Sequence, residues 1–461
     1  MNQCEASHAV GADLTYECLG GNNYRFFFTL YRDCRGIGVN ASYMIRGTST
    51  CGDSVFITVN ADSVHEIMHT CPSVVSACVN FASPYMGVEA NYYHGDVTVP
   101  SICNYWTFGL SPAICNLNAA ITNLDPNGSS YCLYIRATLN NAAVQCNSSP
   151  TFESLPAQFL SAYQAQYYIE HASDIDGDSL AYQMITPHSD SANDVQYIPG
   201  LSATQPVTYI DSTRFNPLTG DVRFYANAPQ ITVMAIEVSE FQNGVKIGSV
   251  ERDIELIFEN TSNSLPIATG MNGSLAFSAN VCADSVMSFR INSIDNDGAD
   301  QTFLSWNGGI PGATFYTTGS HRDTAFFAWQ PGAQDISSQP HVFTVTVVDD
   351  ACPGIGMNSY TYAIYVDSCL STGINPASVN KKISAYYSYQ EHVIHFNYPW
   401  NEESGSVTLI DIAGRELKSM YVEKEYNADK VLEVHDLARG MYLLNFKSGS
   451  GLSQSIKIII D

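Results

Sequence analysis

Alternation of apolar and polar residues is the dominant pattern of this chain. Segments such as Phe26–Leu30 place an apolar side chain at every second position, which is the period of a half-buried strand. Gly, Asn and Pro residues interrupt these segments, and few windows show the helical period of about 3.6 residues. The pattern predicts an all-β protein.

Strands can be placed along much of the chain from this alternation. The strongest hairpin signal is Asn243-Gly244 within Val238–Ile254, because this dipeptide suits the two-residue turns that join antiparallel strands. The other expected strands are Ala12–Gly20, Asn22–Cys34, Ser54–Val59, Tyr105–Leu110, Tyr131–Leu139, Ser406–Asp411, Val431–His435, Gly440–Phe446 and Gln454–Ile460.

Four β modules are expected, since 461 residues exceed what one core organises. The acidic turn Asp174–Leu180 returns as Ser293–Asp300, followed by similar strands, which indicates tandem sandwiches of the Ig-like and cadherin-like type. The expected modules are a cysteine-rich one at 1–148, an Ig-like sandwich at 149–262, a cadherin-like sandwich at 263–372 and a small β-sandwich at 373–461. The polar stretch 371–378 is expected to be the linker at the last of these boundaries.

Thirteen cysteines indicate an oxidising compartment. The absence of C-x-x-C pairs among the first ten argues against a zinc ribbon. Their connectivity stays open, although Cys282 and Cys352 flank the third module and are expected to staple it, which leaves Cys369 as the odd thiol. The expected disulfide cysteines are Cys4, Cys18, Cys34, Cys51, Cys71, Cys78, Cys103, Cys115, Cys132, Cys146, Cys282 and Cys352.

The chain is strongly acidic, with 45 Asp and Glu against 20 Lys and Arg and a net charge of −25. Such a surface repels phosphate backbones, and no basic stripe offsets it, so nucleic-acid binding is excluded. Two explanations of the acidity stay open, which are solubility and the binding of a divalent cation. No run of about 18 apolar residues predicts a transmembrane helix.

Calcium is the expected cation at the acidic turns. Asp174, Asp176 and Asp178 alternate around Gly177 and can direct three carboxylates to one centre, with Glu237 or Glu240 from a neighbouring strand. The alternative is a solvated Asp-Gly turn. Calcium would stiffen the module junctions. The corresponding residues of the third module are Asp295, Asp297 and Asp300, with Asp349 or Asp350.

His65-Glu66-Ile67-Met68-His69 matches the H-E-x-x-H pattern of zinc proteases. That chemistry requires a helix, whereas the flanking residues favour strands, on which His65 and His69 lie too far apart for one metal. Glu89 is a distant candidate ligand. A zinc metalloprotease is therefore a remote alternative, and we expect no enzyme.

Asp-Ser or Asp-Thr followed by a small or aliphatic residue occurs repeatedly and resembles the O-glycosylation signal of Bacteroidetes. We expect glycans on some of Ser54, Ser63, Ser179, Ser191, Ser212, Ser285 and Thr324. The four tryptophans are expected in cores rather than on sugar-binding faces, and they are Trp106, Trp306, Trp329 and Trp400.

Two parts of the chain resemble known families. Residues 6–258, with Ala6–Gly20, Asp174–Leu180 and Glu240–Asp253, resemble modular surface proteins secreted by Bacteroidetes. That resemblance implies exported β modules linked to gliding or adhesion. Val407–Leu417, Leu437–Phe446 and Ser455–Asp461 occur in the order typical of type IX secretion sorting domains, which implies export across the outer membrane by that machinery.

These observations predict a secreted structural or adhesive protein of the cell surface, with a filament or coat subunit as the favoured form. Exposed strand edges would support self-association by strand addition. A carbohydrate-binding accessory protein is the alternative, and it requires exposed aromatic residues. No basic and apolar leader precedes the first cysteine, so the sequence is expected to begin near the mature end.

Overall fold

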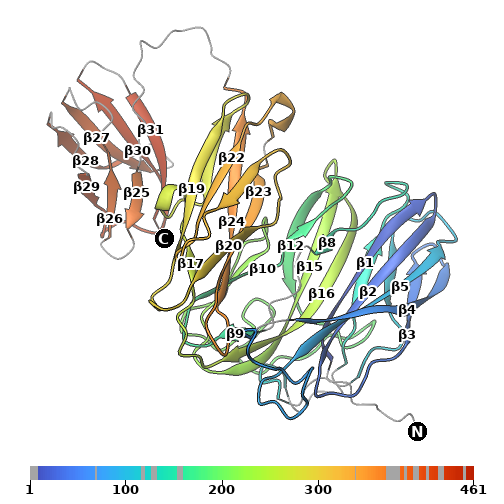
Figure 1. The fold of residues 1–461 in the computed structure, drawn as a ribbon. Helices are drawn as coiled ribbons and strands as arrows, with labels where there is room; N and C mark the ends of the chain where they lie inside the picture. The colour runs from blue at the N-terminus through green and yellow to red at the C-terminus, as the bar shows by residue number, and fades with distance from the viewer. Residues whose placement is uncertain are drawn as a thin grey trace. The chain divides into compact units, whose positions relative to one another are not determined.

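The computed structural model forms two compact units, Met1–Cys369 and Leu370–Asp461 (Figure 1). Regular structure in the described residues is almost entirely strand, with two short 3-10 helices at Met271–Gly273 and Ala333–Asp335, which confirms the all-β prediction. The described residues are 9–67, 70–115, 120–125, 132–152, 159–337, 339–369, 385–388, 392–397, 404–411, 415–423, 430–449 and 453–460.

The N-terminal part of the first unit is one continuous antiparallel path of strands. Its spatial order is β1 (Ala9–Gly20), β2 (Asn23–Asp33), β5 (Val88–Thr98), β4 (Ser54–Ile67), β3 (Ser42–Ser49), β6 (Trp106–Leu110) and β7 (Arg136–Leu139). Both ends of this path meet the same strand, because β7 pairs with residues 248–250 and β1 with residues 252–254 of β16 (Val245–Glu259).

Strand β16 forms a long hairpin with β15 (Gln230–Gln242). The hairpin turns at Asn243 and Gly244, whose φ angles of 53° and 78° are those of the expected two-residue turn. β15 occupies one edge of β16, so β7 and β1 lie in succession along the other edge. β16 therefore links the sheet of the first 148 residues to the segment that follows it.

The module boundary expected at residue 148 is wrong. A single buried core runs from Ala9 to Phe258 and includes side chains of both expected modules, such as Phe26 and Ile254. The reason is that β1 and β7 would otherwise end the first sheet with unpaired backbone groups, and the edge of β16 satisfies them.

The remaining strands of this segment surround the hairpin. The outer neighbour of β15 is β12 (Ser179–Ile185), and β9 (Phe159–Ser161) runs parallel to the end of β16. The smaller sheets contain β10 (Gln166–Ile169), β14 (Asp221–Phe224) and β13 (Arg214–Phe215), and β8 (Thr151–Phe152) with β11 (Ala172–Ser173).

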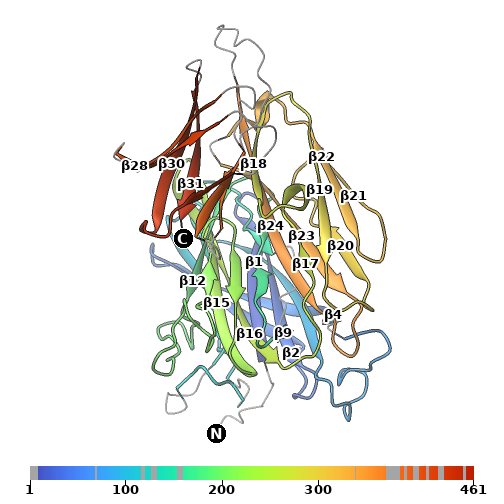
Figure 2. The ribbon, with the colours of Figure 1, turned by 90° about the vertical axis from the view of Figure 1, so that its left-hand side faces the viewer.

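The third module is a sandwich with its own core, which contains Phe289, Phe327, Phe343 and Tyr362. One sheet has the order β17 (Ile267–Ala268), β19 (Met287–Ile294), β22 (Thr324–Trp329) and β21 (Thr314–Thr317). The other has the order β18 (Ser278–Cys282), β24 (Met357–Asp367), β23 (His341–Asp349) and β20 (Thr302–Trp306) (Figure 2).

The second unit is a small two-sheet module around Phe396, Leu409 and Phe446. Its sheets are β25 (Ala385–Ser388), β26 (Val393–Phe396) and β29 (Lys430–Glu433), and β28 (Glu416–Val422), β27 (Gly405–Asp411), β30 (Gly440–Ser448) and β31 (Ser453–Ile460). The four strands expected here all occur, with ends shifted by a few residues.

Six disulfides cross-link the first unit, and two of them correct the sequence-based expectation. Cys282 pairs with Cys369, not with Cys352, because Cys282 ends β18 opposite Asp367 of β24. Cys352 pairs with Cys71, so neither Cys352 nor Cys369 is placed as predicted. The other bonds are Cys18–Cys146, Cys34–Cys78, Cys51–Cys103 and Cys115–Cys132, and Cys4 lies outside the described residues.

Candidate metal centre at the acidic turn

The acidic turn of the second module joins β11 to β12. Asp174 Oδ1 accepts the backbone N–H groups of Asp176 at 3.0 Å and Asp178 at 2.9 Å, and Gly177 has a φ of 80°. This local network needs a short acceptor side chain at the start of the turn and a glycine near its end. It fixes one oxygen of Asp174 and leaves the other to face inward.

Three carboxylates converge at this turn. Ligand oxygens of Asp174, Asp178 and Glu240 all lie within 4.8 Å of one another. Glu240 reaches the turn because its strand β15 pairs with β12, with Leu180 opposite Glu240. The antiparallel register thus brings a distant carboxylate to the pair supplied by the turn.

In both Glu240 and Asp178, one carboxylate oxygen accepts hydrogen bonds from neighbouring side chains. Glu240 Oε1 accepts from Asn147 Nδ2 at 2.6 Å and from the Tyr16 hydroxyl at 3.2 Å. Asp178 Oδ1 accepts from Gln242 Nε2 at 3.2 Å. These donors hold the two carboxylates in place.

The inward oxygens receive no hydrogen bond from the described residues. They are Asp174 Oδ2, Asp178 Oδ2 and Glu240 Oε2, and the buried Asn147 Oδ1 is likewise without a donor. Glu240 is 0% exposed and Asn147 is 1% exposed. Buried acceptors without donors are costly, so this cluster lacks a positive partner.

The electrostatics of the cluster agree with its geometry. Burial, and then the negative charge of Asp174, raise the pKa of Glu240 to about 9. Burial also raises the pKa of Asp174. A cation between these groups would reverse both effects. The donor set consists only of oxygens, which is the set that calcium prefers.

Two predicted ligands do not join the cluster. Asp176 is exposed, and its Oδ2 accepts the backbone N–H of Ser148 at 2.8 Å, so it fixes the incoming chain. Glu237 is paired with Lys246 Nζ at 2.5 Å. Of the two glutamates considered from the sequence, Glu240 is the one at the turn.

The acidic turn of the third module is arranged differently. Arg322 donates to the backbone carbonyls of Asp295 at 3.2 Å, Asp297 at 2.5 Å and Asp300. The described residues contain no group of three metal ligands here. Asp295 Oδ2 and Asn263 Oδ1 nevertheless have no hydrogen-bond donor.

The partners of the remaining predicted ligands are mostly backbone groups. Asp349 accepts the N–H groups of Gly356 at 2.7 Å and Ala351 at 3.1 Å, together with Asn263 Nδ2 at 2.8 Å. Asp350 accepts the N–H of Gln301 at 2.7 Å. The carboxylates predicted as ligands in the third module therefore do not form a group of three around one centre in the described residues.

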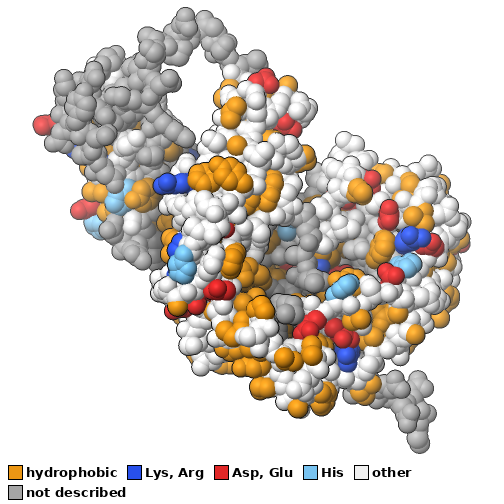
Figure 3. Space-filling model, viewed as in Figure 1, with side chains coloured by type: hydrophobic (Ala, Val, Ile, Leu, Met, Phe, Trp, Pro, Cys, Tyr) orange, Lys and Arg blue, Asp and Glu red, His pale blue; other side chains and the backbone are white. Residues whose placement is uncertain are grey.

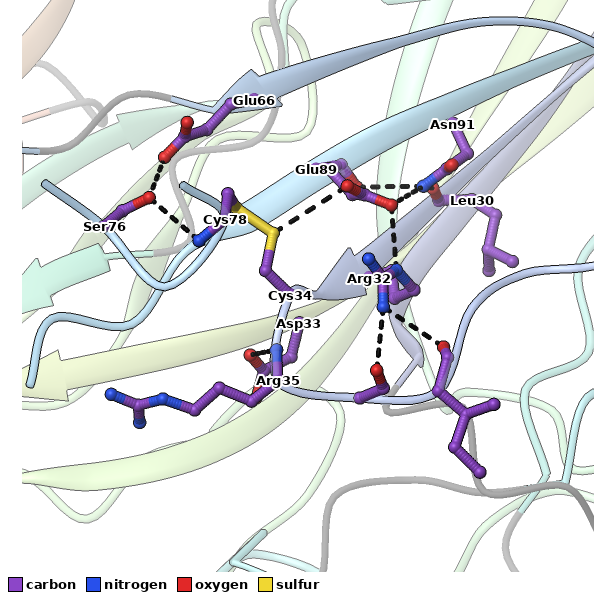
Figure 4. The surroundings of a disulfide bond; sticks show 12 residues. Leu30, Arg32, Asp33, Cys34, Arg35, Glu66, Ser76, Cys78, Glu89 and Asn91 are labelled. Carbon is purple, nitrogen blue, oxygen red and sulfur yellow. Dashed lines mark hydrogen bonds and ion pairs between the residues drawn. A yellow bond between two sulfur atoms is a disulfide. The ribbon is translucent and has the colours of Figure 1, made fainter. Parts of the chain in front are cut away.

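The H-E-x-x-H segment begins on strand β4, not on a helix. Glu66 accepts a hydrogen bond from Ser76, and Glu89 accepts from Arg32 at 2.8 Å and from Asn91 at 3.2 Å (Figure 4). Their oxygens serve structural contacts. His65 is exposed on β4, and His69 lies outside the described residues.

The other predicted positions are distributed over the surface and the cores. Trp106 and Trp329 are buried, Trp306 stacks on Phe315, and Trp400 lies outside the described residues. The predicted glycosylation positions are exposed except for the half-buried Thr324, and their modification stays a prediction; they are Ser54, Ser63, Ser179, Ser191, Ser212, Ser285 and Thr324.

Basic side chains on the face drawn in Figure 3 lie singly or in small groups. In the described part of the chain, no helix is long and apolar enough to span a bilayer.

Sequence reasoning missed Asn147. A signal was present, because Asn147-Ser148-Ser149-Pro150 ahead of the first acidic turn resembles Asn263-Ser264-Leu265-Pro266 ahead of the second. In both places the Asn amide donates to a carboxylate of the last but one strand of the module. An asparagine that recurs at the same place before two acidic turns is a candidate ligand.

Residues 390–461 match the family described as the secretion system C-terminal sorting domain. The chain carries a type IX sorting domain. The protein is therefore a modular secreted protein of the Bacteroidetes type, located outside the cell or at its surface. The sorting domain also implies an interaction with the secretion machinery.

Similar solved structures are tandem β-sandwiches. Drosophila N-cadherin EC1–4 is 13% identical, with 77% of this chain and 83% of that chain covered and a TM-score of 0.18. Tandem Ig repeats of Dlar are 10% identical, covering 48% and 98%, with a TM-score of 0.20. The Bacteroides ovatus mixed-linkage glucan utilisation protein SGBP-B is 13% identical, covering 67% of each chain, with a TM-score of 0.13.

TM-scores this low do not support any conclusion about this chain, so the sandwich architecture rests on the sheets described above. No curated protein matches this chain.

Proposed function

We propose that the protein is a non-enzymatic structural or adhesive component of the cell surface, in which calcium ties the cysteine-rich segment to the second module. The observation that carries the proposal is the convergence of three carboxylates, each of which has one buried oxygen without a donor. The amide of Asn147 donates to one of these carboxylates, and its own oxygen also lacks a donor. The sorting domain supports the location.

The candidate ligands come from three separate segments. Asn147 belongs to the stretch that leaves the first sheet, Asp174 and Asp178 to the turn, and Glu240 to β15. The stretch after Asn147 is also hydrogen-bonded to β1, since Tyr16 N donates to Ser149 Oγ at 2.8 Å. An ion bound by these ligands would resist separation of the segments.

Calcium suits this site better than zinc or magnesium. Zinc prefers nitrogen and sulfur ligands, which this cluster lacks. Magnesium requires a near-ideal octahedron, whereas calcium accepts about six to eight oxygens in flexible geometry, so four protein oxygens and several waters suffice.

The test is calcium-dependent stability. Calcium at about 100 times its Kd would stabilise the native protein by about 2.7 kcal/mol, and the melting temperature should rise by about 5 °C. We expect Glu240→Gln to abolish this rise. Glu237→Gln is the matched control, because Glu237 lies on the same strand and pairs with Lys246 instead. Equal rises in both variants, or none in the native protein, would refute the calcium site.

Self-association into a filament or coat is part of the proposal. In the described sheets β12 is a terminal strand with β15 as its neighbour, and on its other edge the N–H of Tyr182 already donates to the Pro217 carbonyl at 2.8 Å. Strand addition would therefore use the rest of that edge or displace this contact. β12 begins directly after Asp178, so the ion and this edge are coupled. Negative-stain images with and without a chelator test it. Filaments that soften on chelation support it, and monomers in both conditions contradict it.

Carbohydrate binding is the second candidate, and one groove favours it. A cavity of about 520 Å³ is lined by Tyr167, Phe277, Tyr360 and two arginines. The rings of Tyr167 and Tyr360 lie 5.0 Å apart, and Tyr167 is 39% exposed. Stacking on sugars uses such rings. A glycan array with the native protein and Tyr167→Ala separates this function from a purely structural one.

A further inference from the structure

Three disulfides of the first unit join segments that are distant in sequence. Cys71–Cys352 spans 281 positions, Cys34–Cys78 spans 44 and Cys282–Cys369 spans 87. The first of them connects the cysteine-rich segment to the third module. These bonds change the shortest covalent route through the chain.

The Cys71–Cys352 bond lies within a local backbone contact. Cys71 N donates to the Pro353 carbonyl at 3.0 Å, and Thr70 and Gly354 form an isolated antiparallel bridge. The two loops are therefore held together by main-chain hydrogen bonds as well as by the disulfide. The Cys34–Cys78 bond lies close by in sequence and is flanked by Glu89 and Ser76 (Figure 4).

The shortest covalent route from Ala9 to Cys369 contains only three stretches of chain. It runs from residue 9 to Cys34, crosses to Cys78, returns to Cys71, crosses to Cys352 and ends at Cys369. The residues between Cys78 and Cys352 lie off this route. Even if their sheets unfolded under tension, they would not lengthen the unit.

We propose that these bonds make the first unit an extension-limited tether that transmits tension along this covalent shortcut. The inference rests on the proposed surface function, because a protein held at a surface and by a partner bears tension. Cys369 is the last residue of the first unit, so tension from the sorting-domain side enters directly at this route.

Two of the three loaded stretches contain a central strand. Residues 352–369 contain β24, which lies between β18 and β23. Residues 9–34 contain β2, which lies between β1 and β5. A central strand pulled along its axis loads hydrogen bonds on both edges together, so even the short route resists extension.

Single-molecule stretching of the oxidised full chain, held at its two ends, tests this tether. At roughly 3.5 Å per residue, the fully extended route through the first unit should measure about 17 nm, and the gain on unfolding is this length minus the folded distance between its ends. In Cys71→Ser/Cys352→Ser the route changes to Cys18–Cys146 and then Cys282–Cys369, and the extended length should rise to about 50 nm. A thiol reductant should raise it to about 125 nm. The second unit contains no cysteine and gives a constant reference step.

The matched control is Cys115→Ser/Cys132→Ser, whose bond lies off the route and whose loss should leave the extended length of about 17 nm unchanged. If Cys71→Ser/Cys352→Ser does not fold, the native protein alone decides. An extended length near about 50 nm for the oxidised native protein would overturn the tether. Chelation changes the unfolding force but not these lengths, so failure of the calcium site is distinguishable from failure of the tether.

Discussion

The acidic turns of the second and third modules share a local design. In each, a preceding asparagine donates to a carboxylate on the last but one strand, Asn147 to Glu240 at 2.6 Å and Asn263 to Asp349 at 2.8 Å. In each, the next residue's N–H binds the middle aspartate of the turn, at 2.8 Å from Ser148 and at 2.6 Å from Ser264.

The two turns differ in where their positive charge comes from. The first brings three carboxylates together and contains no cation of its own. The second places the Arg322 guanidinium against three backbone carbonyls, and this charge opposes the rise of the Asp295 pKa that burial causes. A repeated motif therefore does not produce the same cluster of carboxylates, because a local counter-charge is present at one turn and not among the described residues of the other.

The largest expected difference is between the two asparagines. Asn147→Ala should destabilise the protein by about 2–3 kcal/mol, because it removes a donor from the fully buried Glu240. Asn263→Ala should cost about 1 kcal/mol, since Asp349 keeps two backbone donors. Chemical denaturation of both variants measures this. Equal losses would contradict the distinction between the turns.

Replacement of Arg322 should make the second turn resemble the first. We expect Arg322→Ala to lose about 2 kcal/mol, because the carbonyls of Asp295, Asp297 and Asp300 lose a charged donor. Calcium should restore part of that loss. Thermal unfolding with and without calcium tests this, with the exposed Arg290→Ala as control. A loss that calcium leaves unchanged would show that this turn has no latent site.

Another expected effect concerns pH in the presence of a chelator. The pKa of Glu240 rises from 4.5 to about 9 on folding, so the folded state holds this proton more tightly. The resulting stability is complete below about 4.5 and is lost as the pH rises towards about 9, with a slope of at most about 1.4 kcal/mol per pH unit. Glu240→Gln should flatten this slope. An identical slope in the variant would contradict the assignment.

The strands could be predicted from the sequence because alternation and turn residues are local. The Asn243-Gly244 hairpin and the four expected strands of the second unit are examples. The closure of β1 and β7 on β16 could not be predicted, since it depends on pairing between residues far apart in the chain. The Cys71–Cys352 bond was missed for the same reason.

The candidate site was partly predictable. Alternating aspartates around a glycine identified Asp174 and Asp178, and the register of β12 with β15 selected Glu240 over Glu237. Asp176 is exposed and accepts the Ser148 N–H instead of joining the cluster, and no local pattern reveals that Arg322 binds the backbone of the second turn.

Closure of the first sheet on β16 also constrains how the protein is made. Strands β1 and β7 find their hydrogen-bonding edge only after residues 245–259 have been synthesised. The N-terminal sheet therefore cannot complete its strand pairing until more than half of the polypeptide has been synthesised. Such long-range pairing slows folding, which favours delivery of an export substrate to its translocation channel before it becomes compact.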